Sequence, residues 1–354
     1  MKNKIITILF IAIIFGIGII SIILKDTKIS TFERRKLASF PEISEDFSED
    51  LDKYLLDQFP FRNSLINLNS IINRKFLNKI DNNDVYVIDN NIIEKNYPLD
   101  EKSCTGFINK INYIINECNE NKVFYSVIPD KSYFLEDDKY LKLDYSKMYE
   151  TLNKNIEADY IDVTSLLKLE DYYETDIHWK QENLFKVVNR IVEGLGKDYK
   201  NIDYIEKEYE NFYGASYSKA GLNLPADKLK YLDSEYFNNV EVNHLEYGKK
   251  QVYDKEKLTN LDSYDVFLSG ASSFIEIKNN NLEDNSSLIL FRDSFTSSIA
   301  PLLIPYYNNI KIVDLRYIDF NIVKEKIDLK NSDVLFLYST LIINNSDIFK
   351  VKTK

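Results

Sequence analysis

The chain has 354 residues, a formal net charge of −11 and a pI near 5.0. Such an acidic chain is not expected to bind nucleic acid, because a phosphate-binding surface needs clustered Lys and Arg, whereas neutral sugar chains remain suitable partners. Two cysteines and two histidines without ligand spacing do not suggest a metal site, and nine glycines do not suggest a nucleotide-binding loop. We therefore predict no metal and no cofactor.

The first segment, residues 1–28, is predicted to be a membrane anchor. Ile5 to Leu24 are uncharged and almost all apolar, and a helix of this length spans the hydrocarbon core of a bilayer, about 30 Å. No small-residue cleavage site closes the run. We expect an uncleaved signal anchor with the amino terminus inside and the bulk of the chain outside. The alternative is a cleaved signal peptide, which also leaves the remainder outside the cytoplasm.

Residues 29–98 are predicted to form a membrane-proximal segment. Apolar residues at helical spacing indicate one helix from Asp46 to Asp57 and another from about Asn63 to Leu77. Val85–Ile88 and Ile92–Glu94, separated by a short polar turn, are typical of a hairpin. Nothing in this segment suggests catalysis, and its expected role is to pack and to space the following domain from the bilayer.

The two cysteines are predicted to be reduced and buried. Cys104 and Cys118 share an apolar stripe at three- to four-residue spacing, which indicates one amphipathic helix. On a continuous helix they would lie about 21 Å apart, well beyond the roughly 7 Å that a disulfide allows.

Residues 99–354 are long enough for one large α/β domain with a sizeable core, since strands alternate with helices along them. Such alternation indicates a mostly parallel sheet with helices on both faces, and residues 200–262 are interpreted as an inserted cap or an ordinary covering loop. The predicted strands are Val123–Ile128, 160–163, 266–268, 274–277, Ser287–Phe291, 310–314 and 333–338, and the predicted helices 104–118, 142–156, 181–194, 296–307 and 319–328. Ligands in such sheets bind at the carboxyl ends of strands, where the pattern places Asp130, Asp176, Ser294, Asp314, Arg316 and Tyr338.

The candidate acid–base residue is His178. Only His178 and His244 are available in this chain, and His244 is interpreted as a solvent-facing strand residue. Asp176 precedes His178 by two positions, and in an extended segment such residues point to the same side. The carboxylate could then orient the imidazole and stabilise its protonated form.

The candidate nucleophile is Ser294, which follows a buried strand and precedes a helix. A serine at such a turn presents its hydroxyl at the carboxyl edge of the sheet, beside the backbone N–H groups of the first helical turn. The alternative is that Asp293 or Ser294 only caps the helix. Together, Asp176, His178 and Ser294 are a possible triad in the chain order Asp, His, Ser.

Several of these runs carry a family resemblance. Thr175–Trp179, Arg292–Phe295 and Val313–Tyr317, together with Phe32–Pro41 and Asp57–Arg62, resemble the motifs of the DHHW protein family over residues 30 to 345. That family is related to SGNH-hydrolase-like proteins that O-acetylate alginate and other exported polysaccharides. One position departs from the motif, because Ile177 replaces the first histidine of the family's name.

The resemblance implies a permuted SGNH-hydrolase-like fold and an extracytoplasmic O-acetyltransferase of an exported or cell-wall polysaccharide. It also implies Arg316 and Tyr338 as accessory oxyanion or substrate-binding residues, the alternatives being an Arg paired with Asp314 and a core Tyr. A multi-pass membrane acyltransferase of the MBOAT kind would supply the acetyl group. Two other functions remain open, a polysaccharide O-acetyl esterase with the same residues and a non-catalytic polysaccharide-binding or assembly protein.

Overall fold

The computed structural model describes residues 2–118 and 121–351. The chain forms two compact units, Met1–Asn83 with Tyr217–Leu224, and Asp84–Ser216 with Pro225–Lys354. Residues 1, 119–120 and 352–354, which belong to the predicted segments 1–28 and 99–354, lie outside the described residues.

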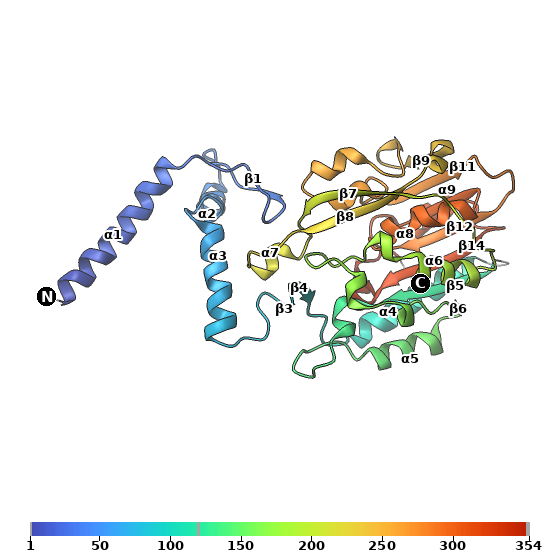
Figure 1. Ribbon diagram of the computed structural model, residues 1–354, viewed down its shortest axis with the longest axis horizontal. Coiled ribbons are helices and arrows are strands. Elements are labelled where there is room, and N and C mark those ends of the chain that lie inside the picture. The colour runs from blue at the N-terminus through green and yellow to red at the C-terminus, as the bar shows by residue number, and fades with distance from the viewer. Residues whose placement is uncertain (1, 119–120, 352–354) are drawn as a thin grey trace. The chain divides into compact units, whose positions relative to one another are not determined.

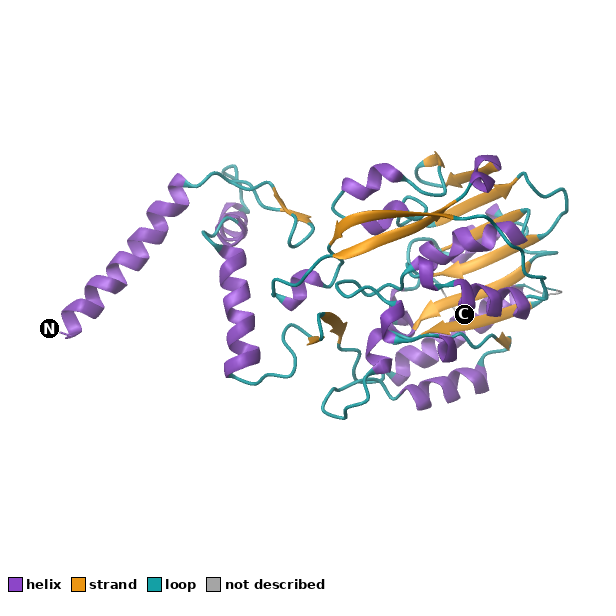
Figure 2. Ribbon diagram, viewed as in Figure 1, coloured by secondary structure: helices purple, strands orange, loops and turns teal. Residues whose placement is uncertain are grey.

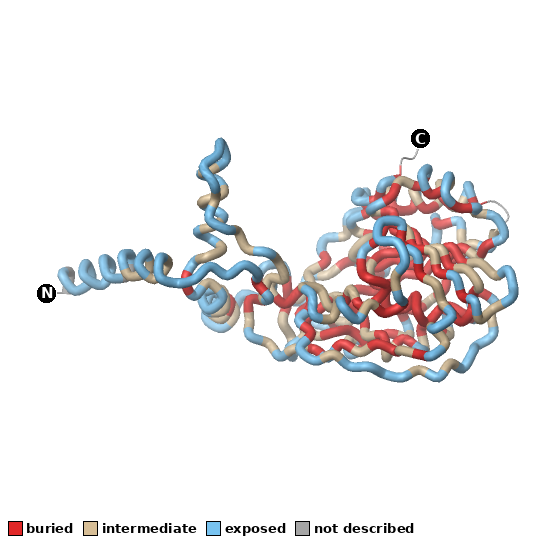
Figure 3. The backbone as a smooth tube through the Cα atoms, turned by 90° about the horizontal axis from the view of Figure 1, so that it is seen from above, coloured by how far each residue is buried: buried red, intermediate tan, exposed pale blue. Residues whose placement is uncertain are grey.

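The first unit begins with the apolar helix α1, Lys2–Ile23. Within the described residues, Lys4–Ile23 is the one helix that is long and apolar enough to cross a membrane, with a mean hydropathy of 3.0 and no part of it buried. Figure 3 shows this helix exposed along most of its length. A short strand pair, β1 (Ile29–Ser30) with β2 (Arg35–Lys36), follows.

Two helices come next in this unit, α2 (Phe47–Asp57) and α3 (Arg62–Ile71), and α3 continues as a π-helix over Ile72–Phe76. The short helix α7, Tyr217–Ala220, belongs to the same unit.

Ion pairs join the two charged runs of this first unit. The Arg35 guanidinium donates to both carboxylate oxygens of Asp57 at 2.8 and 2.5 Å. Arg62 binds Glu33 in the same two-bond manner at 2.8 and 2.9 Å. Paired N–H donors in a planar fork fix both distance and orientation. The runs 32–41 and 57–62 therefore hold each other in one arrangement.

An eight-stranded sheet organises the second unit, in the order β10-β9-β11-β13-β12-β14-β5-β6. Figure 1 labels six of its strands: β9, β11, β12, β14, β5 and β6. The strands from β13 to β6 run parallel, whereas β10, β9 and β11 are antiparallel additions at one side. Their bounds are β5 Val123–Ile128, β6 Asp159–Tyr160, β9 Val240–His244, β10 Gly248–Lys250, β11 Phe274–Asn279, β12 Ser287–Arg292, β13 Asn309–Val313 and β14 Asp333–Ser339.

Helices cover both faces of this sheet, as Figure 2 shows. Successive side chains of β12 point to opposite faces of the sheet and pack into two hydrophobic cores. Leu288 and Leu290 join one core, and Ile289 and Phe291 join the other. Helices α6 (Phe185–Gly194) and α8 (Thr296–Leu303) pack on the first face, and α4 (Glu101–Glu117), α5 (Tyr145–Asn155) and α9 (Phe320–Lys326) on the second. The predicted α/β architecture is confirmed.

Two smaller hairpins complete the second unit, β3 (Val85–Ile88) with β4 (Asn91–Glu94), and β7 (Ile205–Phe212) with β8 (Asp227–Asp233). The β7–β8 hairpin and the strands β9 and β10 all arise from residues 200–262. The role of that stretch as an inserted cap, and the predicted segment boundaries, remain a proposal that limited proteolysis can test.

The strand expected at residues 266–268 does not form. Ser263–Val266 is a 3-10 turn, and Leu268, Ser269 and Gly270 have φ angles of 52°, 55° and 85°. A left-handed backbone cannot continue a pleated strand, so the apolar pattern here reflects a buried turn. The helix expected over 296–307 is also divided, because α8 ends at Leu303 and a 3-10 turn follows over Ile304–Tyr306.

The two cysteines are free and buried, as predicted. Cys104 lies within α4 and Cys118 is its C-cap residue. Burial raises the pKa of the Cys104 thiol to about 11 and that of Cys118 to about 12, so neither is a reactive thiolate at neutral pH.

Candidate active site

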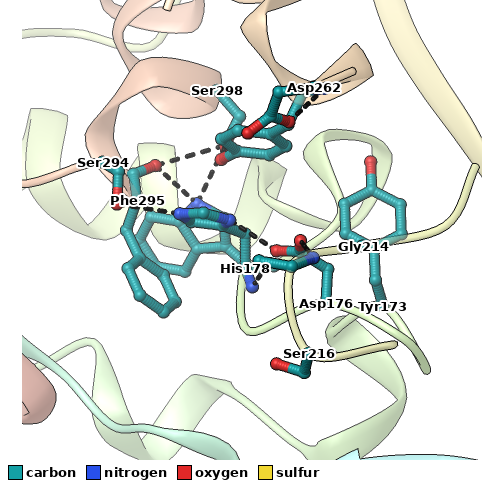
Figure 4. A network of polar contacts seen from close by, with 12 residues as sticks. Tyr173, Asp176, His178, Gly214, Ser216, Asp262, Ser294, Phe295 and Ser298 are labelled. Carbon is teal, nitrogen blue, oxygen red and sulfur yellow. Dashed lines mark hydrogen bonds and ion pairs between the residues drawn. The ribbon is translucent and has the colours of Figure 1, made fainter. Parts of the chain in front are cut away.

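Three predicted residues meet at one edge of the sheet (Figure 4). Nδ1 of His178 lies 2.5 Å from Oδ1 of Asp176, and Nε2 of the same ring lies 2.8 Å from Oγ of Ser294. Asp176 and His178 are 1% and 8% exposed. A carboxylate, an imidazole and a hydroxyl in this sequence of contacts form the proton relay that activates a serine nucleophile.

A tight loop, and not an extended segment, brings Asp176 and His178 together. Tyr172 and Trp179 close the loop as an isolated antiparallel bridge. Inside it, the backbone N–H of His178 donates to Oδ1 of Asp176 at 2.9 Å. The aspartate therefore binds both the backbone and the ring of the residue two positions on. The predicted pairing is present, but its geometric reason was wrong.

Asp176 is held as a carboxylate. Its second oxygen accepts the Ala215 N–H at 2.7 Å. Burial alone would raise the pKa of Asp176, but the His178 ring and the N–H groups of Ala215 and His178 lower it well below its usual range. Hydrogen bonds to the charged form have this effect. The negative charge is thus available to stabilise a protonated imidazole.

Aromatic rings fix the plane of the His178 imidazole. The Tyr264 ring stacks on it with a centroid separation of 4.0 Å and an interplanar angle of 10°. The Phe295 ring also lies against the imidazole, with a centroid separation of 4.8 Å. The Tyr264 hydroxyl donates to Ser298 Oγ at 3.0 Å, which ties the stacking ring to α8. These contacts leave the imidazole little freedom to rotate away from Ser294.

Trp179 joins the histidine loop to the serine helix. Its indole N–H lies 2.9 Å from both the Phe295 carbonyl and Ser298 Oγ, and its side chain is fully buried. Because Trp179 follows His178 directly and Phe295 follows Ser294, this contact holds His178 close to Ser294.

Asp227, on β8, supports the same loop from another side. Its carboxylate accepts the backbone N–H groups of Glu174 and Thr175, both at 2.8 Å, and the Thr175 hydroxyl at 2.6 Å. The Gly214 N–H in turn donates to Thr175 Oγ1 at 2.9 Å. The loop that carries Asp176 is therefore hydrogen-bonded on several sides.

The turn that carries Ser294 is fixed by its neighbour Asp293. The Asp293 side chain accepts the Phe295 N–H at 3.0 Å and the Ser339 N–H at 2.7 Å, which joins the end of β12 to the end of β14. Asp293 is fully buried. Among the described residues, no acceptor pairs with the Ser294 N–H. That N–H is therefore free to bind an oxyanion that forms on an acyl group at Oγ.

Of the predicted accessory residues, Arg316 is paired with a carboxylate and Tyr338 is buried. Arg316 binds Asp314 through two hydrogen bonds of 2.9 and 2.6 Å, and Asp314 is fully buried. Tyr338 is 1% exposed, and its hydroxyl has no partner among the described residues. Their predicted roles as accessory residues remain a proposal.

The interpretation of His244 as a solvent-facing residue is wrong. His244 is 4% exposed and shares a face of β9 with the fully buried Val242. Alternation itself places residues 242 and 244 on one side, so the pattern was misread. Burial, with the nearby Arg292, lowers the pKa of His244 to about 4. This histidine is neutral at physiological pH and has no ring hydrogen bond among the described residues.

Sequence reasoning missed the residues that hold the site together, which are Lys131, Gly214, Ala215, Asp227 and Tyr264. Each lies far along the chain from the loop that it contacts, so no local spacing indicates it. One signal was present, because Gly214 is one of only nine glycines and a glycine often marks a close approach of two backbones.

Gly214→Ala is expected to lower activity by about 10²-fold, the effect of displacing a catalytic group by about 1 Å. A Cβ at position 214 would lie 2.2 Å from Cβ of Asp176 and 2.5 Å from its Cα, so the aspartate must move. The measurement is kcat/KM for an activated acetyl ester. Gly106→Ala is the control, since its Cβ meets only Ser346 Oγ at 3.3 Å. Equal activity of the Gly214→Ala variant and the unaltered chain would contradict this close approach.

Comparison with known proteins agrees with this architecture. The largely parallel sheet with helices on both faces is the expected SGNH-hydrolase-like fold. A family model described as DHHW protein matches residues 137–313, and the chain belongs to this family. Ile177, at the position of the family's first histidine, packs against the apolar core.

Two solved structures show the same fold. A DHHW family protein from Eubacterium siraeum has a TM-score of 0.62 at 20% identity, with 78% of this chain and 98% of that chain covered. PatB1 of Bacillus cereus, solved with a sulfonyl adduct, has a TM-score of 0.59 at 19% identity, covering 73% and 97%. The O-acetyltransferase domain of Pseudomonas putida AlgJ is more distant, with a TM-score of 0.42 at 8% identity, covering 73% and 92%. No curated protein matches the sequence.

Proposed function

We propose that this chain is a membrane-anchored, extracytoplasmic O-acetyltransferase that acts on an exported or cell-wall polysaccharide. The observation that carries the proposal is the Asp176–His178–Ser294 relay, with ring-to-partner distances of 2.5 and 2.8 Å. A protein that only bound a glycan would have no need of an activated nucleophile. We therefore prefer an enzyme to a binding or assembly protein.

In the first half-reaction, Ser294 accepts the acetyl group. His178 Nε2 takes the proton from Ser294 Oγ as Oγ attacks the acetyl carbonyl carbon. The Ser294 N–H would bind the oxyanion of the tetrahedral intermediate. Collapse of this intermediate breaks the bond to the donor's leaving group, which receives the proton from His178. Asp176 stabilises the imidazolium throughout.

In the second half-reaction, the acetyl group passes to a sugar hydroxyl. His178 removes the proton of the acceptor hydroxyl, whose oxygen attacks the acetyl carbonyl carbon of the acyl-enzyme. The ester bond to Ser294 Oγ breaks, and the serine recovers a proton from His178. With water as the acceptor the same steps release acetate, so the relay alone serves an esterase equally well.

The location and the partners belong to the same proposal. Helix α1 would anchor the chain, with the second unit outside the cytoplasm. Acetyl-CoA is cytoplasmic, so a membrane acyltransferase of the MBOAT kind would carry the acetyl group across. Arg316 and Tyr338 are proposed to lie near bound substrate, since Arg316 follows β13 and Tyr338 lies in the last two residues of β14, at the carboxyl edge that carries Ser294.

The test is the fate of the acetyl group from an activated ester. The full chain in detergent, given p-nitrophenyl acetate, should carry one acetyl group on Ser294, located by peptide mass spectrometry. Prior treatment of the chain with a sulfonyl fluoride should block acetylation of Ser294. The sulfonyl adduct of PatB1 suggests this probe. An added oligosaccharide should then divert acetyl from water to sugar. Faster release of acetate from an acetylated glycan would instead indicate an esterase, and no acetyl-enzyme would leave only a binding protein.

A further inference from the structure

A buried lysine lies directly behind the acidic member of the relay. Lys131 follows β5 and is 3% exposed. Its ammonium donates to three backbone carbonyl oxygens, those of Tyr173 at 2.7 Å, Glu174 at 3.0 Å and Asp176 at 3.3 Å. All three belong to the loop that carries Asp176 and His178.

We propose that Lys131 is a positioning residue. Its ammonium binds these three carbonyls and so holds the Asp176 carboxylate against His178. This inference rests on the proposed function of the relay. An ammonium has three N–H groups and no acceptor, so the three carbonyls use its full capacity. Among ordinary side chains, only a compact cation can satisfy three carbonyls that converge on one point.

The neighbouring contacts show why the loop needs this support. Oδ1 of Asp176 accepts the backbone N–H of His178 and contacts its ring Nδ1, and Oδ2 accepts the Ala215 N–H. Asp227 holds the preceding N–H groups of the loop, and Lys131 holds its carbonyls. The Glu174 carbonyl also accepts the Ile92 N–H at 2.8 Å and would keep that donor. The buried Tyr173 carbonyl would lose the Lys131 ammonium, its donor at 2.7 Å, and an unsatisfied buried carbonyl is costly. The loop would then move to regain partners, and Asp176 would move with it.

The charges that face Lys131 come from several elements. Asp227, Asp176 and Glu174 favour its protonated form, and Lys180 opposes it. Glu94 and Asp130 line a cavity of about 10 Å³ beside it, with Ile177 and Leu341. The Asp130 carboxylate does not compete for the ammonium, since donors from Asn96, Ser132, Tyr145 and Thr340 occupy it.

The geometry has a consequence for the pH dependence of activity. Burial lowers the pKa of Lys131 from 10.5 to about 8 although the nearby carboxylates oppose this. Below this value the ammonium holds the loop. Above it, a neutral amine donates only two N–H groups and turns a lone pair towards the third carbonyl. Activity should therefore fall as the pH rises through about 8.

Folding stability should change in the opposite direction. Between the folded pKa of about 8 and the ordinary value of 10.5, the unfolded chain binds more protons at Lys131 than the folded chain. The contribution of this group to the free energy of unfolding therefore rises with pH across that window. A loss of activity above pH 8 should thus occur without unfolding, which circular dichroism can follow.

The experiment compares the unaltered chain with Lys131→Met and with Lys180→Met as a matched control. Lys180 lies nearby, but its ammonium contacts only the Glu170 carbonyl at 3.3 Å. Lys131→Met should lower kcat/KM for p-nitrophenyl acetate by about 10²-fold at neutral pH, and Lys180→Met should not. A folded Lys131→Met variant with unaltered activity, or an unaltered chain whose activity stays flat through pH 8 to 9, would overturn the proposal.

A second readout separates this inference from the proposed function. Incorporation of ¹⁵N-histidine labels only His178 and His244, and the ring ¹⁵N shifts of His178 report its hydrogen bond to Asp176 without any substrate. These shifts should change in Lys131→Met and, in the unaltered chain, as the pH passes about 8. If the chain formed no acetyl-enzyme, the proposed acetyltransferase function would be refuted. The ¹⁵N shifts of His178 would still test the positioning role of Lys131. Unchanged shifts in both cases would refute the positioning role. If the variant did not fold, the unaltered chain alone would decide.

Discussion

Ser294→Ala is expected to abolish the acetyl-enzyme and to lower turnover of an activated acetyl ester by about 10⁶-fold, the scale seen when a serine relay loses its nucleophile. The reason is local, since Nε2 of His178 lies 2.8 Å from Ser294 Oγ and the aromatic rings around it hold it there. An alanine leaves the base with no hydroxyl to deprotonate. The measurements are ester turnover and peptide mass spectrometry of the acetylated chain.

His178→Ala should cause a loss of similar size, and the double variant should be no worse than either single one, because residues that act as a unit are not additive. Ser332→Ala is a matched control, as Ser332 precedes β14 at the opposite edge of the parallel strands. Acetylation that persisted in Ser294→Ala would place the nucleophile elsewhere and refute the proposed relay.

Asp176→Asn is expected to retain the fold and to lower kcat by about 10⁴-fold, as in serine enzymes whose histidine is left in the wrong tautomer. In the unaltered chain Oδ1 accepts both the N–H and the ring of His178, and Oδ2 accepts the Ala215 N–H. An amide has one acceptor and one donor end. It must therefore turn its NH₂ group towards one of these N–H groups, and the stabilising negative charge is lost in either orientation.

Kinetics and circular dichroism together check this second result. Asp333→Asn is a suitable control, because Asp333 accepts the Tyr307 hydroxyl at the start of β14, away from the relay. A folded Asp176→Asn variant with kcat close to that of the unaltered chain would show that the carboxylate does not orient the base.

The parallel part of the fold was predictable because its signal is local. Buried runs such as Val123–Ile128 and Ser287–Arg292 are short, apolar and bounded by polar turns, and they form β5 and β12. The antiparallel strands were harder to recognise. Strand β7, Ile205–Phe212, is almost entirely exposed, so it lacks the apolar face that would indicate a strand.

Some residues of the candidate site could also be predicted from local sequence, and others could not. Asp176 and His178 are two residues apart, and Ser294 lies at a recognisable strand-to-helix turn, so each could be named from the sequence. Tyr264, which stacks on the imidazole, lies far along the chain from His178, in the 3-10 turn Ser263–Val266. The contact of Gly214 with Asp176 depends on tertiary packing alone. Long-range contacts of this kind leave no periodic trace in a single sequence.

The buried indole of Trp179 also gives the protein an optical reporter. It is the chain's one tryptophan, it follows the candidate base directly, and it is hydrogen-bonded to the first turn of α8 beyond the nucleophile. Light that tyrosine does not absorb excites this ring alone, so the emission reports a single environment. Any shift of the serine turn relative to the histidine loop would alter the wavelength or the intensity of that emission. Events at Ser294 can therefore be followed in time through intrinsic fluorescence, without a label and without a coloured substrate.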